Sequence, residues 1–167
     1  MKSPKLFLSD IDGVLTDGKL YYTKNGEEIK AFNVMDGLGI KLLQSAGIKF
    51  GVISGRHSEA LLNRLRELNI EIVYTGNHHK LDIYESIKKD LSLEDEEVCY
   101  MGDDLVDIPI LKRVGFSFAP SNAHPFVKSF CRYITKKQGG DGALREAIEY
   151  VLDKTGKLSD ILTSFDF

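Results

Sequence analysis

The stretch Lys5–Asp17, KLFLSDIDGVLTD, decides the fold that we expect for this chain. It begins with a short, nearly apolar run that ends abruptly at Asp10. Such a run is typical of a strand that is covered on both faces in a parallel sheet. Asp10 and Asp12 are two residues apart, so an extended chain points both carboxylates to one side, and Gly13 permits a turn directly after them. We therefore expect an acidic pair at the carboxyl end of a buried strand, where open α/β sheets bind ligands.

Two simpler interpretations of this triplet compete with a functional one. An Asp-x-Asp sequence on its own is most often a solvated turn. A calcium-binding loop would need an oxygen ligand at its fifth position and a glycine at its sixth, but Val14 and Leu15 stand there. The triplet therefore gains functional meaning only if other strand ends carry matching chemistry.

The composition is typical of a single folded domain, which we expect to span residues 1–167. The chain is 43% hydrophobic, which is enough to supply a sizeable core. Its formal net charge is −3, with both signs mixed along the chain, so we expect no nucleic acid partner. No apolar run approaches the roughly 20 residues of a membrane span, and the N-terminus shows no signal-peptide pattern. Cys99 and Cys131 stand far apart, which favours reduced thiols in a cytoplasmic protein.

The rest of the chain alternates between strand and helix patterns, apart from one hairpin. Asn25 and Gly26 separate two β-rich runs and predict a hairpin arm over about residues 19–32. Isolated hairpins are marginal in water, so we expect this arm to contact a partner surface such as another subunit. The tail, about residues 157–167, shows no clear period, and for its end, Phe165–Phe167, disorder is the default expectation. Further strands are expected over 48–53, 71–74, 98–101, 116–119 and 133–135, and helices over 36–46, 58–69, 80–91, 104–114 and 143–154, with another beginning near 123.

This alternation predicts an α/β fold with a Rossmann-like parallel sheet, helices on both faces and a projecting β-hairpin. In such a sheet the carboxyl ends of the strands lie along one edge, and successive strand ends here carry polar groups. Each group alone has an ordinary explanation, such as a turn, a helix cap or a solvated lysine. Their arrival at one edge would be improbable by chance. The groups are Asp10 with Asp12, Ser54, Lys80 after the third strand, and Asp103 with Asp104 and Asp107.

Carboxylates, a hydroxyl and a cation suit phosphoryl transfer to an aspartate. Each carboxylate would repel a nearby phosphate by roughly 4 kcal/mol at 4 Å and an effective dielectric constant of 20. One lysine cannot cancel that repulsion, so a divalent cation is required. Oxygen ligands with open positions for water and phosphate point to Mg²⁺.

This set of motifs resembles the haloacid dehalogenase superfamily of phosphatases. The resemblance rests on Asp10-Ile-Asp-Gly-Val14, Ser54-Gly55, Lys80 and Gly102-Asp-Asp104 with Asp107, and it spans most of the chain. It implies that Asp10 is the nucleophile and that Asp12 protonates the leaving oxygen and later activates water. It also implies that Gly13, Ser54, Gly55 and Lys80 belong to the phosphate-binding set, that Asp10, the carbonyl of Asp12 and Asp103 hold Mg²⁺, and that Asp107 supports the metal. Asp104 is either part of this site or a helix cap only.

The spacing between the motifs leaves no room for a cap domain, so the site would be open. Within the superfamily, the chain resembles the capless family of 3-deoxy-D-manno-octulosonate 8-phosphate phosphatases. That resemblance rests on Asp10–Gly18, on Phe32-Asn33 with Asp36-Gly37, on Ser54-Gly-Arg56, and on Gly139–Glu146. It implies hydrolysis of a phosphorylated keto sugar acid for the lipopolysaccharide inner core. It also implies a homotetramer whose hairpin arms meet and whose tails, including Phe165–Phe167, cover neighbouring sites.

Several assignments stay open at this point. Sister enzymes that hydrolyse 2-keto-3-deoxynononate 9-phosphate share most motifs but tend to carry an acid where Arg56 stands, which favours the eight-carbon substrate. Arg64 either reaches a neighbour's substrate or is a solvated helix arginine. His78 and His79 are interpreted as incidental. A non-enzymatic phospho-acceptor module of the response-regulator type is the rival from another class, but Asp12 supplies the acid and base that turnover needs. A catalytically dead scaffold is disfavoured because no expected catalytic position is missing.

Overall fold

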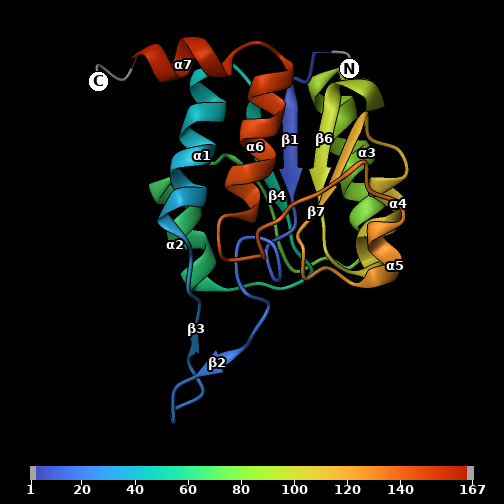
Figure 1. The fold of residues 1–167 in the computed structure, drawn as a ribbon. Coiled ribbons are helices and arrows are strands. Elements are labelled where there is room, and N and C mark those ends of the chain that lie inside the picture. Colours follow the sequence, from blue (N-terminus) through green and yellow to red (C-terminus); the bar gives the residue numbers. More distant parts are fainter. Residues whose placement is uncertain (1–2, 165–167) are drawn as a thin grey trace.

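A six-stranded parallel sheet with helices on both faces forms the body of the protein (Figure 1), as expected from the sequence. The computed structural model describes residues 3–164. From one edge to the other, the strands are β5 (Ile72–Tyr74), β4 (Lys49–Ile53), β1 (Leu6–Ser9), β6 (Val98–Met101), β7 (Phe116–Ala119) and β8 (Tyr133–Ile134). The helices are α1 (Val34–Ser45), α2 (Glu59–Glu67), α3 (Lys80–Leu91), α4 (Ile108–Leu111), α5 (Pro125–Lys128), α6 (Ala143–Lys154) and α7 (Leu158–Ser164), with 3-10 turns at Asp95–Glu97 and Leu105–Asp107.

The central strand β1 separates two hydrophobic cores. Phe7 points into a core formed with α1, α2 and α6, where its ring lies 6.0 Å from that of Phe50 and 5.5 Å from that of Phe118. Leu6 and Leu8 point to the other face, into a core formed with α3, α4 and α5. Side chains alternate between the faces of a strand, so a strand buried on both faces needs an apolar residue at every position. This requirement explains the apolar run that precedes Asp10.

Several predicted elements have the expected bounds, and one predicted helix is divided. The strands at 98–101 and 116–119 and the helices at 80–91 and 143–154 begin and end where the sequence indicates. The helix predicted over 104–114 instead consists of the 3-10 turn Leu105–Asp107 followed by the four-residue α4. Asp104 and Asp107 form a reciprocal capping box that tightens the first turn, and Pro109 lies in the first turn of α4, where its missing N–H leaves no gap.

Most of the tail, for which the sequence shows no clear period, forms a helix. Residues Leu158–Ser164 form α7, and Leu158 and Ile161 pack against the core beside α1 and α6. Lys157 anchors the start of this helix, because its Nζ donates to the carbonyl of Ala46 over 2.6 Å. The short apolar pattern was too weak to indicate this helix from the sequence. Phe165–Phe167 lie outside the described residues. Within residues 3–164, no helix is long and apolar enough to span a bilayer.

The predicted hairpin arm is present and projects beyond the carboxyl ends of the strands (Figure 1). Its strands β2 (Tyr21–Tyr22) and β3 (Glu28–Ile29) are only two residues long and pair antiparallel. Tyr21, Tyr22 and Ile29 remain 41%, 56% and 52% exposed. These large apolar side chains are not covered within the described part of this chain.

A buried carboxyl group joins α1 to α6, the helix pair that covers one face of the sheet. Asp36 lies in the first turn of α1, is only 2% exposed, and its Oδ1 accepts the backbone N–H of Arg145 over 2.8 Å. Among residues 3–164, its Oδ2 atom has no hydrogen-bond partner. Burial therefore raises the pKa of Asp36 to about 6, although the amide of Arg145 favours the charged form. Burial thus favours the protonated carboxyl more than the helix end favours the charged one.

The raised pKa of Asp36 predicts a loss of stability between acidic and neutral pH. The folded-state pKa lies above the usual value of 3.8, so the protonated group stabilises the fold at low pH and this contribution disappears as the pH rises to about 6. Two pKa units correspond to about 3 kcal/mol. Asp36→Asn should remove this contribution in urea titrations at pH 4 to 7, whereas Asp153→Asn, at an exposed position of α6, should keep it. Equal pH slopes in both variants would contradict the assignment.

Candidate active site

The polar groups predicted at the strand ends do lie along one edge of the sheet. The strands β5, β4, β1 and β6 are neighbours and run parallel, so the segments that follow them meet beyond their carboxyl ends. A cavity of about 320 Å³ opens there. Its lining residues are Asp10, Asp12, Gly18, Ser54, Gly55, Arg56, His78, Lys80, Asp103, Asp104 and Val106.

Lys80 is the central cation of this cavity. It is the first residue of α3, and its side chain is only 3% exposed. Its Nζ lies 2.8 Å from Oδ1 of Asp10 and 2.8 Å from Oδ1 of Asp107. Burial alone would lower the pKa of Lys80, but the two carboxylates outweigh burial and raise it. The lysine therefore stays charged and bridges the end of β1 to the turn after β6.

Asp107 is a fully occupied acceptor rather than a free ligand. Its Oδ1 also accepts the hydroxyl of Tyr100 over 2.7 Å. Its Oδ2 accepts the backbone N–H groups of Asp103 and Asp104 over 3.0 Å and 3.2 Å. Asp107 is entirely buried, so these donors are its means of compensating for lost water. The carboxylate thereby fixes Lys80 and the backbone that carries Asp103. Its support of a bound metal stays a prediction.

Asp10, Asp103 and Asp107 together carry more negative charge than Lys80 can neutralise. Oxygen atoms of Asp10, Asp103 and Asp107 all lie within 4.8 Å of one another, with Lys80 as the nearby cation. Burial and the charge of Asp107 raise the pKa of Asp10 to about 6. Burial and the charge of Asp10 raise the pKa of Asp103 to about 8. Among residues 3–164, Oδ1 of Asp103 is buried without a hydrogen-bond partner. Two such carboxyls and a bare oxygen fit a hard divalent cation.

Glycine is required at position 13 because Asp103 lies against it. The φ angle of Gly13 is +95°, and a Cβ atom there would lie 2.0 Å from Oδ2 of Asp103. The loop between β8 and α6 packs on the same segment, because a Cβ on Gly139 would lie 1.8 Å from the carbonyl oxygen of Gly13. Gly13 therefore permits the acidic pair of β1 and the acid after β6 to approach each other.

Asp12 is contacted by Arg56, a predicted site residue, and by Lys30, which no sequence motif singled out. Its Oδ1 forms an ion pair with Nζ of Lys30, which follows β3 of the hairpin arm. Its Oδ2 lies 3.8 Å from Nε of Arg56. Glu28 contacts both cations. Its Oε1 atom lies 3.4 Å from Nζ of Lys30 and 3.0 Å from Nη2 of Arg56. No local signal distinguishes Lys30 from other arm lysines, because its contact with Asp12 depends on how the arm folds back.

Of the remaining predicted residues, Ser54 and Gly55 line the cavity and Arg64 does not. Ser54 is buried at the end of β4, and Gly55 lies against His78, whose Nδ1 would be 2.9 Å from a Cβ at that position. His78 therefore lines the cavity, although the sequence analysis interpreted it as incidental. Arg64, by contrast, does not line this cavity; it lies on α2 and pairs with Glu67 at 3.1 Å.

Asp104 has a defined local role. Its Oδ1 accepts the N–H of Leu105 over 2.7 Å, so it caps the 3-10 turn while also lining the cavity. Asp104 is therefore a cap that also lines the cavity, and its functional part in the site stays a prediction.

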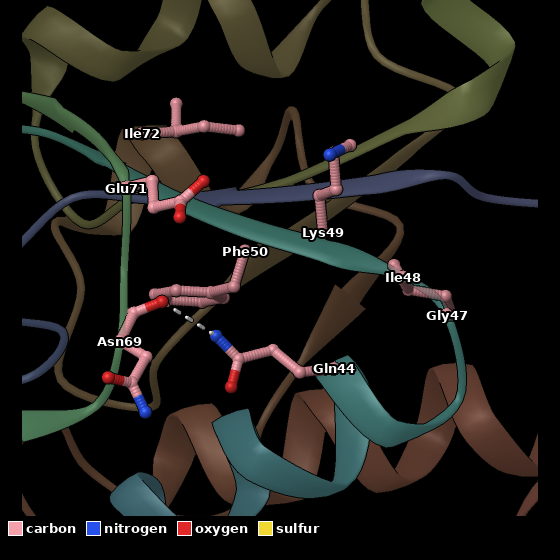
Figure 2. A pocket seen from close by; sticks show the side chains of 8 residues that line it. All are labelled: Gln44, Gly47, Ile48, Lys49, Phe50, Asn69, Glu71 and Ile72. Carbon is pink, nitrogen blue, oxygen red and sulfur yellow. Dashed lines mark hydrogen bonds between the residues drawn. The ribbon is translucent and has the colours of Figure 1, made fainter.

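A second pocket, also of about 320 Å³, lies at the opposite end of the sheet, where β4 and β5 begin (Figure 2). Gln44 donates to the carbonyl of Asn69 across it over 3.5 Å. Lys49 and Glu71 are the charged residues among its lining side chains. This pocket has neither the clustered carboxylates nor a buried cation, so its lining offers no comparable chemistry.

Comparisons with known proteins agree with this geometry. Residues 72–146 match the haloacid dehalogenase-like hydrolase family. The chain is 40% identical over 156 residues to the 3-deoxy-D-manno-octulosonate 8-phosphate phosphatase KdsC of Escherichia coli K12, covering 93% of this chain and 83% of that protein.

Solved structures are similar over nearly the whole chain. The phosphatase of the same name from Moraxella catarrhalis, in complex with magnesium, phosphate and a KDO molecule, has a TM-score of 0.96 and 36% identity, and the match covers 99% of this chain and 95% of that one. The cobalt-bound enzyme of Haemophilus influenzae has a TM-score of 0.91 and 40% identity, with 99% and 94% covered. The chain therefore belongs to the haloacid dehalogenase-like family of 3-deoxy-D-manno-octulosonate 8-phosphate phosphatases.

Proposed function

We propose that this protein is a Mg²⁺-dependent phosphatase that hydrolyses 3-deoxy-D-manno-octulosonate 8-phosphate to the free sugar acid and phosphate. The observation that carries the proposal is the buried set of Asp10, Asp103 and Asp107 around Lys80, in a chain 40% identical to phosphatases of that name. The product would serve synthesis of the lipopolysaccharide inner core.

In the proposed reaction, Asp10 attacks the phosphorus atom and becomes a phosphoryl-aspartate. Its Oδ1 is fixed by Lys80 at 2.8 Å, so the carboxylate is oriented before substrate arrives. Lys80 would also neutralise the oxygens of the transferring phosphoryl group. Asp12, on the same side of the cavity, would give its proton to the leaving oxygen and then take one from the water that hydrolyses the intermediate. Ser54 with Gly13 and Gly55 would complete the phosphate-binding edge.

Asp10, Asp103 and the backbone carbonyl of Asp12 would hold Mg²⁺. The bare Oδ1 of Asp103 and the raised pKa values of both acids support this assignment. When bound, Mg²⁺ supplies the positive charge that lets an anionic phosphate enter among carboxylates. Asp107 would keep Lys80 and the Asp103 backbone in place for both the metal and the phosphate.

Recognition of the sugar acid would involve more than one subunit. Arg56 lines the cavity with its side chain 43% exposed and is the proposed contact for the sugar. We propose a cytoplasmic homotetramer in which the arms meet and Arg64 reaches a neighbour's substrate. The exposed Tyr21, Tyr22 and Ile29 of the arm support such an assembly, because uncovered apolar side chains of this size favour a protein interface.

Substrate identity can be tested by parallel assays of phosphate release. With Mg²⁺, we expect a clearly higher kcat/KM on 3-deoxy-D-manno-octulosonate 8-phosphate than on 2-keto-3-deoxynononate 9-phosphate, and no release after a chelator is added. Preference for the nine-carbon ester would move the protein to the sister branch with the same chemistry. Release from neither would contradict the proposed substrate.

Replacement of the nucleophile tests the mechanism. Asp10→Asn removes the attacking oxygen, and kcat should fall roughly 10⁴-fold or more. The fold should persist, because an amide can still accept from Lys80. Asp82→Asn, at an exposed position in the first turn of α3, is the matched control and should keep full activity. Circular dichroism checks the fold of both variants. Appreciable turnover by Asp10→Asn would remove Asp10 as the nucleophile.

Metal binding should depend on pH in a defined direction. Without metal, the raised pKa values of Asp10 and Asp103 mean that their protonated forms stabilise the fold, and this stability is lost as the pH rises from about 4 to about 8. Bound Mg²⁺ requires the charged carboxylates, so it must displace protons at low pH. The rise in Tm caused by MgCl₂ should therefore be larger at pH 8 than at pH 5.5. NaCl of equal ionic strength is the control, and an equal shift at both pH values would contradict the metal assignment.

A further inference from the structure

Lys30 has a buried side chain at the end of the largely exposed hairpin arm. Its side chain is 3% exposed, whereas the side chain of Lys19, at the start of the same arm, is 73% exposed. Burying an ammonium group is costly unless opposite charges compensate for the lost water. The compensating charges are Asp12 and Glu28. The arm thus places a buried cation directly on the side chain proposed to donate the proton.

The charges around Asp12 balance only when Lys30 is present. Two carboxylates, Asp12 and Glu28, face two cations, Lys30 and Arg56. Arg56 is closer to Glu28, at 3.0 Å, than to Asp12, at 3.8 Å. Without Lys30, both carboxylates would share one half-exposed guanidinium that already favours Glu28. Lys30 is therefore the cation that can respond to a change of charge on Asp12.

We infer that Lys30 is a positioning residue that orients the Asp12 carboxyl and stabilises the charge it gains when it donates its proton. This inference rests on the proposed function. In the first step, the bond from Asp10 to phosphorus forms, the ester P–O bond breaks, and the proton of Asp12 moves to the leaving oxygen. Asp12 thereby becomes a carboxylate beside the Lys30 ammonium. The ammonium group of Lys30 is fixed in place before the reaction, so it can stabilise the carboxylate of Asp12 that forms in the transition state.

If Lys30 acts through Asp12, its loss should affect the rate to a degree that depends on the leaving group. A purely structural role would not produce this dependence. A poor leaving group needs the proton of Asp12 in the transition state, whereas a good one departs as a stable anion with little help. Loss of Lys30 should therefore harm esters of weakly acidic alcohols more than esters of acidic phenols. Substituted phenyl phosphates are suitable probes, because they differ in leaving-group acidity and hardly in shape.

The test compares kcat/KM for 4-nitrophenyl phosphate and phenyl phosphate in the Mg²⁺-loaded wild type, Lys30→Met, Lys30→Arg and Lys19→Met. Lys30→Met should lose about tenfold more on phenyl phosphate than on 4-nitrophenyl phosphate. Lys30→Arg should recover part of that difference because it keeps the charge, and Lys19→Met should match the wild type. The ratio is measured on one preparation, so an unfolded fraction cancels.

The proposed function and the role of Lys30 can fail separately. An equal fall on both esters, or none, in Lys30→Met would overturn the role of Lys30 and leave the phosphatase intact. A wild type that with Mg²⁺ releases phosphate neither from these esters nor from 3-deoxy-D-manno-octulosonate 8-phosphate would overturn the proposed function and this inference together.

Discussion

The buried ion pairs of Lys80 are the interaction on which the site depends. One ammonium group lies 2.8 Å from Asp10 and 2.8 Å from Asp107, with almost no exposure to water. Removing both carboxylates would leave a buried charge without a partner, which is far more destabilising than losing a surface pair. The pairs join three separate segments: the end of β1, the start of α3 and the turn after β6. Their geometry therefore requires the parallel order of the strands.

The site is nevertheless left with an excess of negative charge. Lys80 cannot neutralise Asp10, Asp103 and Asp107 together, and burial together with the neighbouring carboxylates raises the pKa values of Asp10 and Asp103. A rigid cluster of this kind is unfavourable for the metal-free fold above neutral pH and favourable for a divalent cation. Stability and function oppose each other here, and the surrounding core provides the rigidity that keeps the carboxylates together.

The hairpin arm connects assembly and chemistry. Its strands β2 and β3 carry the exposed Tyr21, Tyr22 and Ile29, while Lys30, directly after β3, pairs with Asp12. The arm therefore has two distinct surfaces, one that the described residues leave uncovered and one in contact with the proposed catalytic acid. A change in the position of the arm would alter both the proposed subunit interface and the surroundings of Asp12.

The sequence by itself determined the parallel sheet, the strand-end acids, Ser54 and Lys80, because buried strands and their abrupt polar ends leave a strong local pattern. The hairpin could be predicted from Asn25 and Gly26 for the same reason, because its turn depends on adjacent residues only. Only the tertiary structure decided that Lys30 contacts Asp12, that Tyr100 donates to Asp107 and that the tail forms α7 on the core. These contacts join residues far apart in the chain or depend on a few apolar side chains, so no periodicity records them. Local patterns report burial and turns, whereas partner choice between distant side chains is settled only when the chain is packed.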